Sequence, residues 1–210
     1  KDSSNDLETA RAAGGNDLLT IENADEVVFT NTALDDATER TNLGNIAGAT
    51  TASVTANVKG TFDQLNAIAN INNSDKLAFE IIEDISNSNF NKLQAKTANS
   101  TLAFSSTKGF SDTVDAFVKG DASALTDDFA SNQSSVASGT PIKFSTWTVG
   151  ELPGSRAKMS MVQKLTEQAL GVVTGTFKRG DGGSIVSFDE IRDLKFGKIG
   201  NDPHEITVDI

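Results

Sequence analysis

The sequence of 210 residues contains no cysteine and no tyrosine, and only one histidine, one tryptophan and three prolines. Without cysteine the chain has no disulfides and no thiol nucleophile, and a single histidine excludes most transition-metal sites. Basic residues are also few: 18 Lys and Arg stand against 29 Asp and Glu, for a formal net charge of −11. Because nucleic acids bind to a positive surface, we expect no nucleic-acid partner.

Long apolar runs are absent as well. None approaches the roughly 20 residues that cross a bilayer, so we expect no membrane span. The apolar fraction of 37% is enough for a hydrophobic core in one domain or two small ones. Small polar residues dominate, and together with Val, Ile and Phe they are typical of short strands joined by turns.

Three regions differ in pattern. Residues 1–48 are polar at first and are interpreted as an N-terminal arm, or a short helix, followed by edge strands. Short strands are predicted within this region at residues 18–21 and 26–29, separated by a polar turn. Residues 49–138 form a strand–helix region and residues 139–210 an antiparallel β region; the alternative is that all three belong to one compact domain.

The strand–helix region begins with the clearest periodicities. Residues 52–58 alternate small polar residues with Val and Ala, the period of a half-buried strand. Phe62, Leu65 and Ile68 then follow at helical spacing, and Thr61 is placed to cap the N-terminus of that helix. The pair predicts a strand followed by a short helix.

Similar pairs recur further along. The pattern F-x-x-L-x-A occurs twice and L-A-F occurs twice, which predicts about three degenerate units of roughly 20 to 28 residues between residues 51 and 120. An ordinary α/β domain of coinciding composition is the alternative. The recurring segments are 62–67 and 90–95 for the helices and 77–79 and 102–104 for the strands, with a further helix predicted at 110–118.

The run TTASVTANVKGTFDQLNAIANINNSDKLAFEI, within residues 49–120, resembles repeat units of very large bacterial surface proteins, especially those of marine cyanobacteria. In such proteins a strand, a small polar turn and a short helix make up each unit. The units are non-catalytic spacers or adhesive modules, so the resemblance implies a structural role and no active site.

The last third favours an antiparallel sheet. A strand is predicted at residues 142–149 and a helix at 158–170, followed by two hairpins. The overall prediction is therefore a β-rich α+β fold, with strand–helix units in the middle and antiparallel hairpins at the end. The predicted hairpin strands are 171–177 with 184–188, and 194–199 with 205–210.

Three motifs suggest binding, and each has a simpler interpretation. Residues 14–19 resemble half of a glycine–aspartate calcium repeat, but one copy cannot supply six oxygen ligands, so a turn before a strand is favoured. Residues 179–190 lack the acidic ligands of a calcium loop in either register. Arg179-Gly180-Asp181 is the integrin-recognition tripeptide, yet the run Gly180-Asp181-Gly182-Gly183 is also typical of a hairpin turn.

Two acidic groups and one histidine are the candidate catalytic residues. A glycosidase needs two carboxylates facing each other across a cleft, a geometry that sequence does not give, and no nucleophile motif accompanies the histidine. We therefore predict no catalytic residue, no cofactor-binding residue, no metal ligand and no enzyme activity. Phe144 and Trp147 are interpreted as core and interface residues in preference to a sugar platform. The acidic groups are Glu80, Glu83 and Asp84, and Asp189, Glu190 and Asp193; the histidine is His204.

Taken together, the patterns favour a non-enzymatic structural subunit of an extracellular or cell-surface assembly: a surface layer, a filament or an adhesin. Its expected partners are copies of itself, joined by strand pairing through residues 1–30 and 205–210. One alternative is a virion subunit, such as a tail tube or capsid-surface protein. A second is a calcium- or carbohydrate-binding module.

Overall fold

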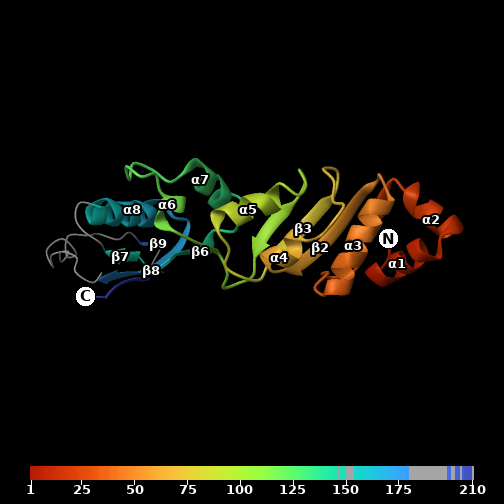
Figure 1. Ribbon diagram of the computed structural model, residues 1–210, viewed down its shortest axis with the longest axis horizontal. Coiled ribbons are helices and arrows are strands. Elements are labelled where there is room, and N and C mark those ends of the chain that lie inside the picture. Colours follow the sequence, from red (N-terminus) through yellow and green to blue (C-terminus); the bar gives the residue numbers. More distant parts are fainter. Residues whose placement is uncertain (146, 150–153, 180–197, 200–201, 204, 210) are drawn as a thin grey trace. The chain divides into compact units, whose positions relative to one another are not determined.

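The computed structural model describes residues 1–145, 147–149, 154–179, 198–199, 202–203 and 205–209. The chain forms two compact units (Figure 1). Unit 1 comprises Lys1–Glu83 and Ser88–Ser105, and unit 2 comprises Asp84–Asn87 and Ser106–Ile210. Each unit is built on its own sheet.

The sheet of unit 1 has four strands that are all parallel and follow one another in chain order, β1-β2-β3-β4. A parallel neighbour can be reached only by a crossover, and here each crossover contains a helix: α3, α4 and α5 in turn. The strands are β1 (Glu26–Val28), β2 (Ser53–Gly60), β3 (Lys76–Ile81) and β4 (Thr101–Phe104). The helices are α1 (Ser4–Ala13), α2 (Gly15–Glu22), α3 (Ala37–Ala49), α4 (Phe62–Asn66) and α5 (Asn87–Gln94).

The register shows that unit 1 is built from successive similar segments, called turns here, each of which adds one helix and one strand to the sheet. Val58 pairs with Phe79, and Phe79 pairs with Leu102, so side chains of successive strands lie in rows across the sheet. Asp2 makes a parallel bridge to Phe29, which adds a strand-like start before α1 and β1. Turns of about 20 to 30 residues that each add one strand and one helix are typical of solenoid repeat proteins.

Local capping explains where two of these helices begin. The Asp36 side chain accepts a hydrogen bond from the Glu39 backbone N–H at the start of α3. The predicted Thr61 cap is confirmed: its hydroxyl accepts from Gln64 N, and the Gln64 side chain accepts from Thr61 N in return. This reciprocal capping box fixes α4 directly after β2, although the helix ends at Asn66, earlier than predicted.

The core of unit 1 lies between the sheet and the helices. Its strand positions alternate with solvent-facing ones, as the period of two requires. Helices α3, α4 and α5 supply the opposing side chains. The buried apolar residues include Val54, Val58, Leu77, Phe79, Ile81, Leu102, Leu43, Ile46, Leu65, Phe90 and Leu93.

A buried aspartate connects three successive turns of unit 1. Asp75 has no solvent exposure, and its carboxylate accepts hydrogen bonds from Val54 N at 2.9 Å and from Asn72 N at 2.8 Å. Its carbonyl oxygen accepts from the Thr97 hydroxyl at 2.5 Å. One residue therefore fixes the start of β2, its own turn and the approach to β4.

Unit 2 contains a second parallel sheet, in the order β5-β6-β8-β11, with β7 also paired to β8. Ile85 makes a parallel bridge to Phe110, so the segment Asp84–Asn87 lies beside β5. A two-residue antiparallel pair, β9 with β10, lies outside this sheet. The elements are β5 (Phe110–Asp112), α6 (Val114–Phe117), α7 (Asp127–Ser134), β6 (Gly139–Phe144), β7 (Trp147–Val149), α8 (Gly154–Gln168), β8 (Gly171–Arg179), β9 (Lys198–Ile199), β10 (Asp202–Pro203) and β11 (Glu205–Asp209).

The predicted β-rich α+β class is wrong, because the chain has an α/β fold with parallel sheets in both units. Strand β8 pairs in parallel with β6, β7 and β11, so the antiparallel pairing predicted for the last third does not form there. Alternation of side chains marks a strand but not its direction. Direction follows from the connection, and α8 provides a crossover long enough for a parallel return. The second predicted strand of the first hairpin, residues 184–188, lies outside the described residues.

Aromatic packing forms the centre of unit 2. Phe129 meets Phe110 edge-on at 5.3 Å between ring centroids and lies 4.5 Å from the Phe117 ring. A buried amide pair lies beside them, in which Asn132 Nδ2 donates to Asn87 Oδ1 at 2.7 Å. This bond ties α7 to the short segment that begins the unit.

Candidate functional site

The strand order decides where a site can form. In open α/β sheets, ligands bind in the crevice where the strand order reverses. Neither sheet reverses: as far as the strands are described, each order follows the chain from first to last. The topology therefore supplies no such crevice, and candidate sites must lie on the sheet faces, on the sheet edges or between helices.

One face of the unit 1 sheet is open and polar. Crossovers between neighbouring parallel strands share one hand, so a sheet in chain order has its crossover helices on a single face. On the other face the side chains are exposed or half-buried and mostly small. They are Ser53, Thr55, Asn57 and Lys59 from β2, Lys76, Ala78 and Glu80 from β3, and Thr101 and Ala103 from β4.

Charges on this open face are paired. Lys59 Nζ lies 2.9 Å from Glu80, and Lys76 Nζ lies 3.3 Å from Glu26. The Thr55 hydroxyl and the Lys76 ammonium both donate to the Glu26 carboxylate, and these bonds lower the pKa of Glu26. The face therefore offers neutralised charges, hydroxyls and amides.

A groove of about 390 Å³ lies in the open face. Its lining combines two hydroxyls and one amide with apolar groups, and its one carboxylate is already paired to Lys59. Such a lining fits a neutral polar chain better than an ion. The lining residues are Thr32, Ala33, Asn57, Val58, Ala78, Phe79, Glu80, Thr101, Leu102, Ala103 and Phe104.

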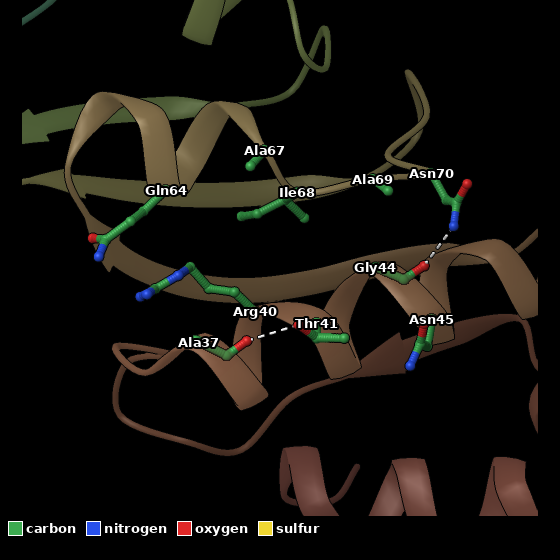
Figure 2. Close-up of a pocket in the computed structure, with 10 residues that line it drawn as sticks. All are labelled: Ala37, Arg40, Thr41, Gly44, Asn45, Gln64, Ala67, Ile68, Ala69 and Asn70. Atoms are coloured by element: carbon green, nitrogen blue, oxygen red, sulfur yellow. Dashed lines mark hydrogen bonds between the residues drawn. The ribbon is translucent and has the colours of Figure 1, made fainter.

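A second hollow, of about 450 Å³, lies between α3 and the segment that contains α4 and residues 67–70 (Figure 2). Asn70 donates to the Gly44 carbonyl at 3.0 Å across one end of the hollow. Asn70 adopts φ of +60°, a left-handed conformation that asparagine tolerates better than most residues. A Cβ on Gly44 would lie 3.2 Å from the Ala69 carbonyl oxygen, so the close approach of the two segments favours glycine.

Arg40 is the charged residue of this second hollow. It is only 8% exposed, and its Nη1 donates to the Lys59 carbonyl at 3.0 Å. Figure 2 shows its side chain extending from α3 toward Gln64 on α4. Sequence reasoning missed this residue. The available signal was its spacing, because Arg40, Leu43, Gly44 and Ala47 lie on one buried helix face at i, i+3, i+4 and i+7.

The acidic residues considered for catalysis are occupied by structural bonds. Glu83 accepts from Phe62 N at 2.7 Å, at the start of α4. Asp84 accepts from Lys143 Nζ at 2.6 Å and from Gly109 N at 3.0 Å. Glu80 pairs with Lys59 on the open face. The remaining candidates, Asp189, Glu190, Asp193 and His204, lie outside the described residues.

The sequence motifs for binding have ordinary structural roles where they are described. Gly14 and Gly15 form the junction between α1 and α2 with φ of +69° and +60°, and the two leucines that follow are helical, so the predicted turn before a strand is wrong. Among the described residues no group of three or more His, Cys, Asp or Glu is placed to hold a metal ion. Arg179 ends β8, and the rest of its tripeptide is outside the described residues. Phe144 is 4% exposed and belongs to the core.

Comparisons with models of protein families, with curated proteins and with solved structures find no match to this chain. In the part of the chain that the structure describes, no helix has the length and apolar character needed to cross a membrane.

Proposed function

We propose that the protein is a non-enzymatic structural module of an extracellular assembly, in which copies join by strand pairing. The observation that carries the proposal is the strand order: both sheets are parallel and run in chain order. Among the described strands neither order reverses, so neither sheet forms the switch-point crevice of doubly wound α/β folds, and each sheet ends in a strand edge.

Strand β11 is the edge on which we expect assembly to occur. Among the described strands it pairs only with β8, in parallel and along its whole length. A strand from a second copy added in parallel on the other side would repeat the pairing that the sheet already uses. A contact between two different edges is heterologous, and it generates an open filament unless the rotation between copies closes a ring.

Neutral carbohydrate binding is a second candidate function, favoured by the groove in the open face of unit 1. Its hydroxyl and amide groups, from Thr32, Thr101 and Asn57, suit sugar hydroxyls. Calorimetric titration with a panel of neutral glycans tests this function, with Ala78→Trp as the variant that fills the groove and abolishes binding.

The assembly proposal is tested with two proline variants in β11. The N–H groups of alternate residues in a strand point to opposite edges, so one of Ile206→Pro and Thr207→Pro removes a donor that faces away from β8, while the other disrupts pairing with β8. We expect wild type to form oligomers in light scattering and filaments in electron micrographs. The outward-facing proline should keep the circular dichroism spectrum and abolish assembly.

A wild-type chain that remains monomeric at high concentration would refute the proposal. Closed particles instead of filaments would favour the virion alternative. Deletion of residues 1–30 tests separately whether assembly uses the first edge of the unit 1 sheet, because it removes Asp2 and Phe29, which bridge there.

A further inference from the structure

The guanidinium of Arg40 has no anionic partner in the described protein. The chain carries eleven more acidic than basic residues. Even so, none of the ion pairs among the described residues includes Arg40, and its side chain makes one hydrogen bond, to the Lys59 carbonyl. Arginine stays protonated in proteins, and buried charges are ordinarily paired because desolvation is costly.

Arg40 lines the second hollow, and its unused donors are not fully buried. Within the described residues, Ser4 Oγ is the one fully buried side-chain N or O atom without a partner. The other guanidinium nitrogens are therefore not sealed in the core, and Arg40 lines the hollow of about 450 Å³. The same hollow contains Gln64, whose carbonyl oxygen is held by Thr61 N, which leaves its amide N–H₂ as a further donor.

We propose that this hollow, the Arg40 pocket, binds a small hydroxylated carboxylate such as a sugar acid. A carboxylate matches the two parallel N–H groups of a guanidinium and supplies the missing charge. A volume near 450 Å³ is within the range of small-molecule sites. The rest of the ligand would lie among the Thr41 hydroxyl, the Asn45 amide and the methyl groups of Ala67 and Ala69.

A singly charged ligand fits this pocket better than a phosphate dianion. Arg40 is the only cationic residue among those that line the pocket. Glu8 contacts the pocket from outside, where its carboxylate accepts from Asn45 at 3.1 Å, but its charge is paired to Arg11 at 2.7 Å. One guanidinium balances one carboxylate, whereas a dianion would leave an uncompensated charge in an acidic protein.

The experiment titrates isotope-labelled full-length protein and follows the Arg40 Nε–H signal by NMR. The probes are galacturonate, its neutral counterpart galactose, acetate and inorganic phosphate. We expect galacturonate to shift the signal with saturation, acetate to shift it more weakly, and galactose to leave it unchanged. Arg40→Met should weaken galacturonate binding at least tenfold, and Arg40→Lys should weaken it less, because lysine keeps the charge without the bidentate geometry. Lys76→Met is the control: it removes one positive charge from the open face of the same unit and should bind as wild type.

A second measurement separates binding from a structural role. A buried charge without an anionic partner costs desolvation free energy that an apolar side chain of similar volume avoids, so unliganded Arg40→Met should melt no lower than wild type. The proposal is overturned if no carboxylate shifts the Arg40 signal, if phosphate binds more tightly than galacturonate, or if Arg40→Met is strongly destabilised while wild type binds none of the probes.

Discussion

Substituting Asp75 by alanine tests whether the turns of unit 1 depend on one another. The variant removes the carboxylate that accepts from Val54 N and Asn72 N and leaves the neighbouring backbone in place. Asp75 is fully buried, so water does not readily replace the missing acceptors. The hydrogen bond that the Thr97 hydroxyl donates to the carbonyl of residue 75 is retained, because alanine has the same carbonyl.

The magnitude follows from the two orphaned donors. Each buried N–H left without an acceptor costs about 1 to 3 kcal/mol, so the pair costs about 2 to 6 kcal/mol. This is a large part of the roughly 5 to 15 kcal/mol by which a domain is stable. With a urea m-value of about 1.5 kcal/mol per molar, the middle of that range lowers the unfolding midpoint by roughly 2.5 M.

The assay combines urea unfolding, followed by circular dichroism, with hydrogen exchange of single amides. The Val54 and Asn72 amides should lose protection in Asp75→Ala before the rest of β2 does. Asp75→Asn should lie between wild type and alanine, because its amide keeps one acceptor oxygen. Asp63→Ala, which removes an exposed carboxylate from the first turn of α4, is the matched control and should change the free energy of unfolding by less than about 1 kcal/mol. An Asp75→Ala variant with wild-type stability and unchanged Val54 protection would refute the reasoning.

Three further predictions follow from contacts in both units. Gly171→Ala should prevent unit 2 from folding normally, as seen by loss of dispersed NMR signals, because a Cβ there would clash with the Thr140 carbonyl oxygen. Phe129→Ala should lower the free energy of unfolding by about 3 to 5 kcal/mol in urea titrations, since it empties the centre of an aromatic cluster. Hydrogen bonding to Arg11 lowers the pKa of Glu8 from its ordinary value of 4.5, so the pair stabilises the fold above that value and ceases to do so as the pH falls through the folded-state pKa. An NMR titration should find the Glu8 pKa closer to 4.5 in an Arg11→Met variant, and an unchanged pKa would contradict this cause.

Much of unit 1 could be predicted from periodicity. The alternation over 52–58 corresponds to β2, the recurring L-A-F segments lie in β3 and β4, and the Thr61 cap is where the sequence predicted it. These features are local, because side-chain alternation and capping depend on residues a few positions apart. Sequence patterns of this kind are therefore sufficient to place single elements.

Local sequence patterns did not predict the direction of strand pairing, nor whether a short apolar run forms a helix or a strand. Leu18, Leu19 and Ile21 suggested a strand but form part of α2, since three apolar residues within four positions are compatible with either period. Residues 110–118 were predicted to be one helix, yet Phe110 begins β5 and only Val114–Phe117 is helical. Phe110 lies in a strand because Ile85, distant in sequence, pairs with it.

The candidate site was less predictable than the fold. Each described acidic residue that was a catalytic candidate accepts a hydrogen bond from a backbone N–H or forms an ion pair with a lysine. Arg40 was not predicted as a site residue, because a single arginine in a helix forms no recognisable motif. Its significance depends on its burial and on its lack of an ion pair among the described residues, and both are properties of the folded chain.

The two proposed interactions can be separated because they act on different units. A ligand that binds the native state stabilises it in proportion to the free energy of binding. In a linear array of turns this effect is largest near the site, because each turn contacts mainly its neighbours. A carboxylate in the Arg40 pocket should therefore protect amides of α3 and β2, whereas strand addition at β11 should protect the outward-facing amides of β11 and depend on protein concentration. Carboxylate-dependent protection confined to unit 2 would contradict the placement of the anion site at Arg40, whatever its affinity.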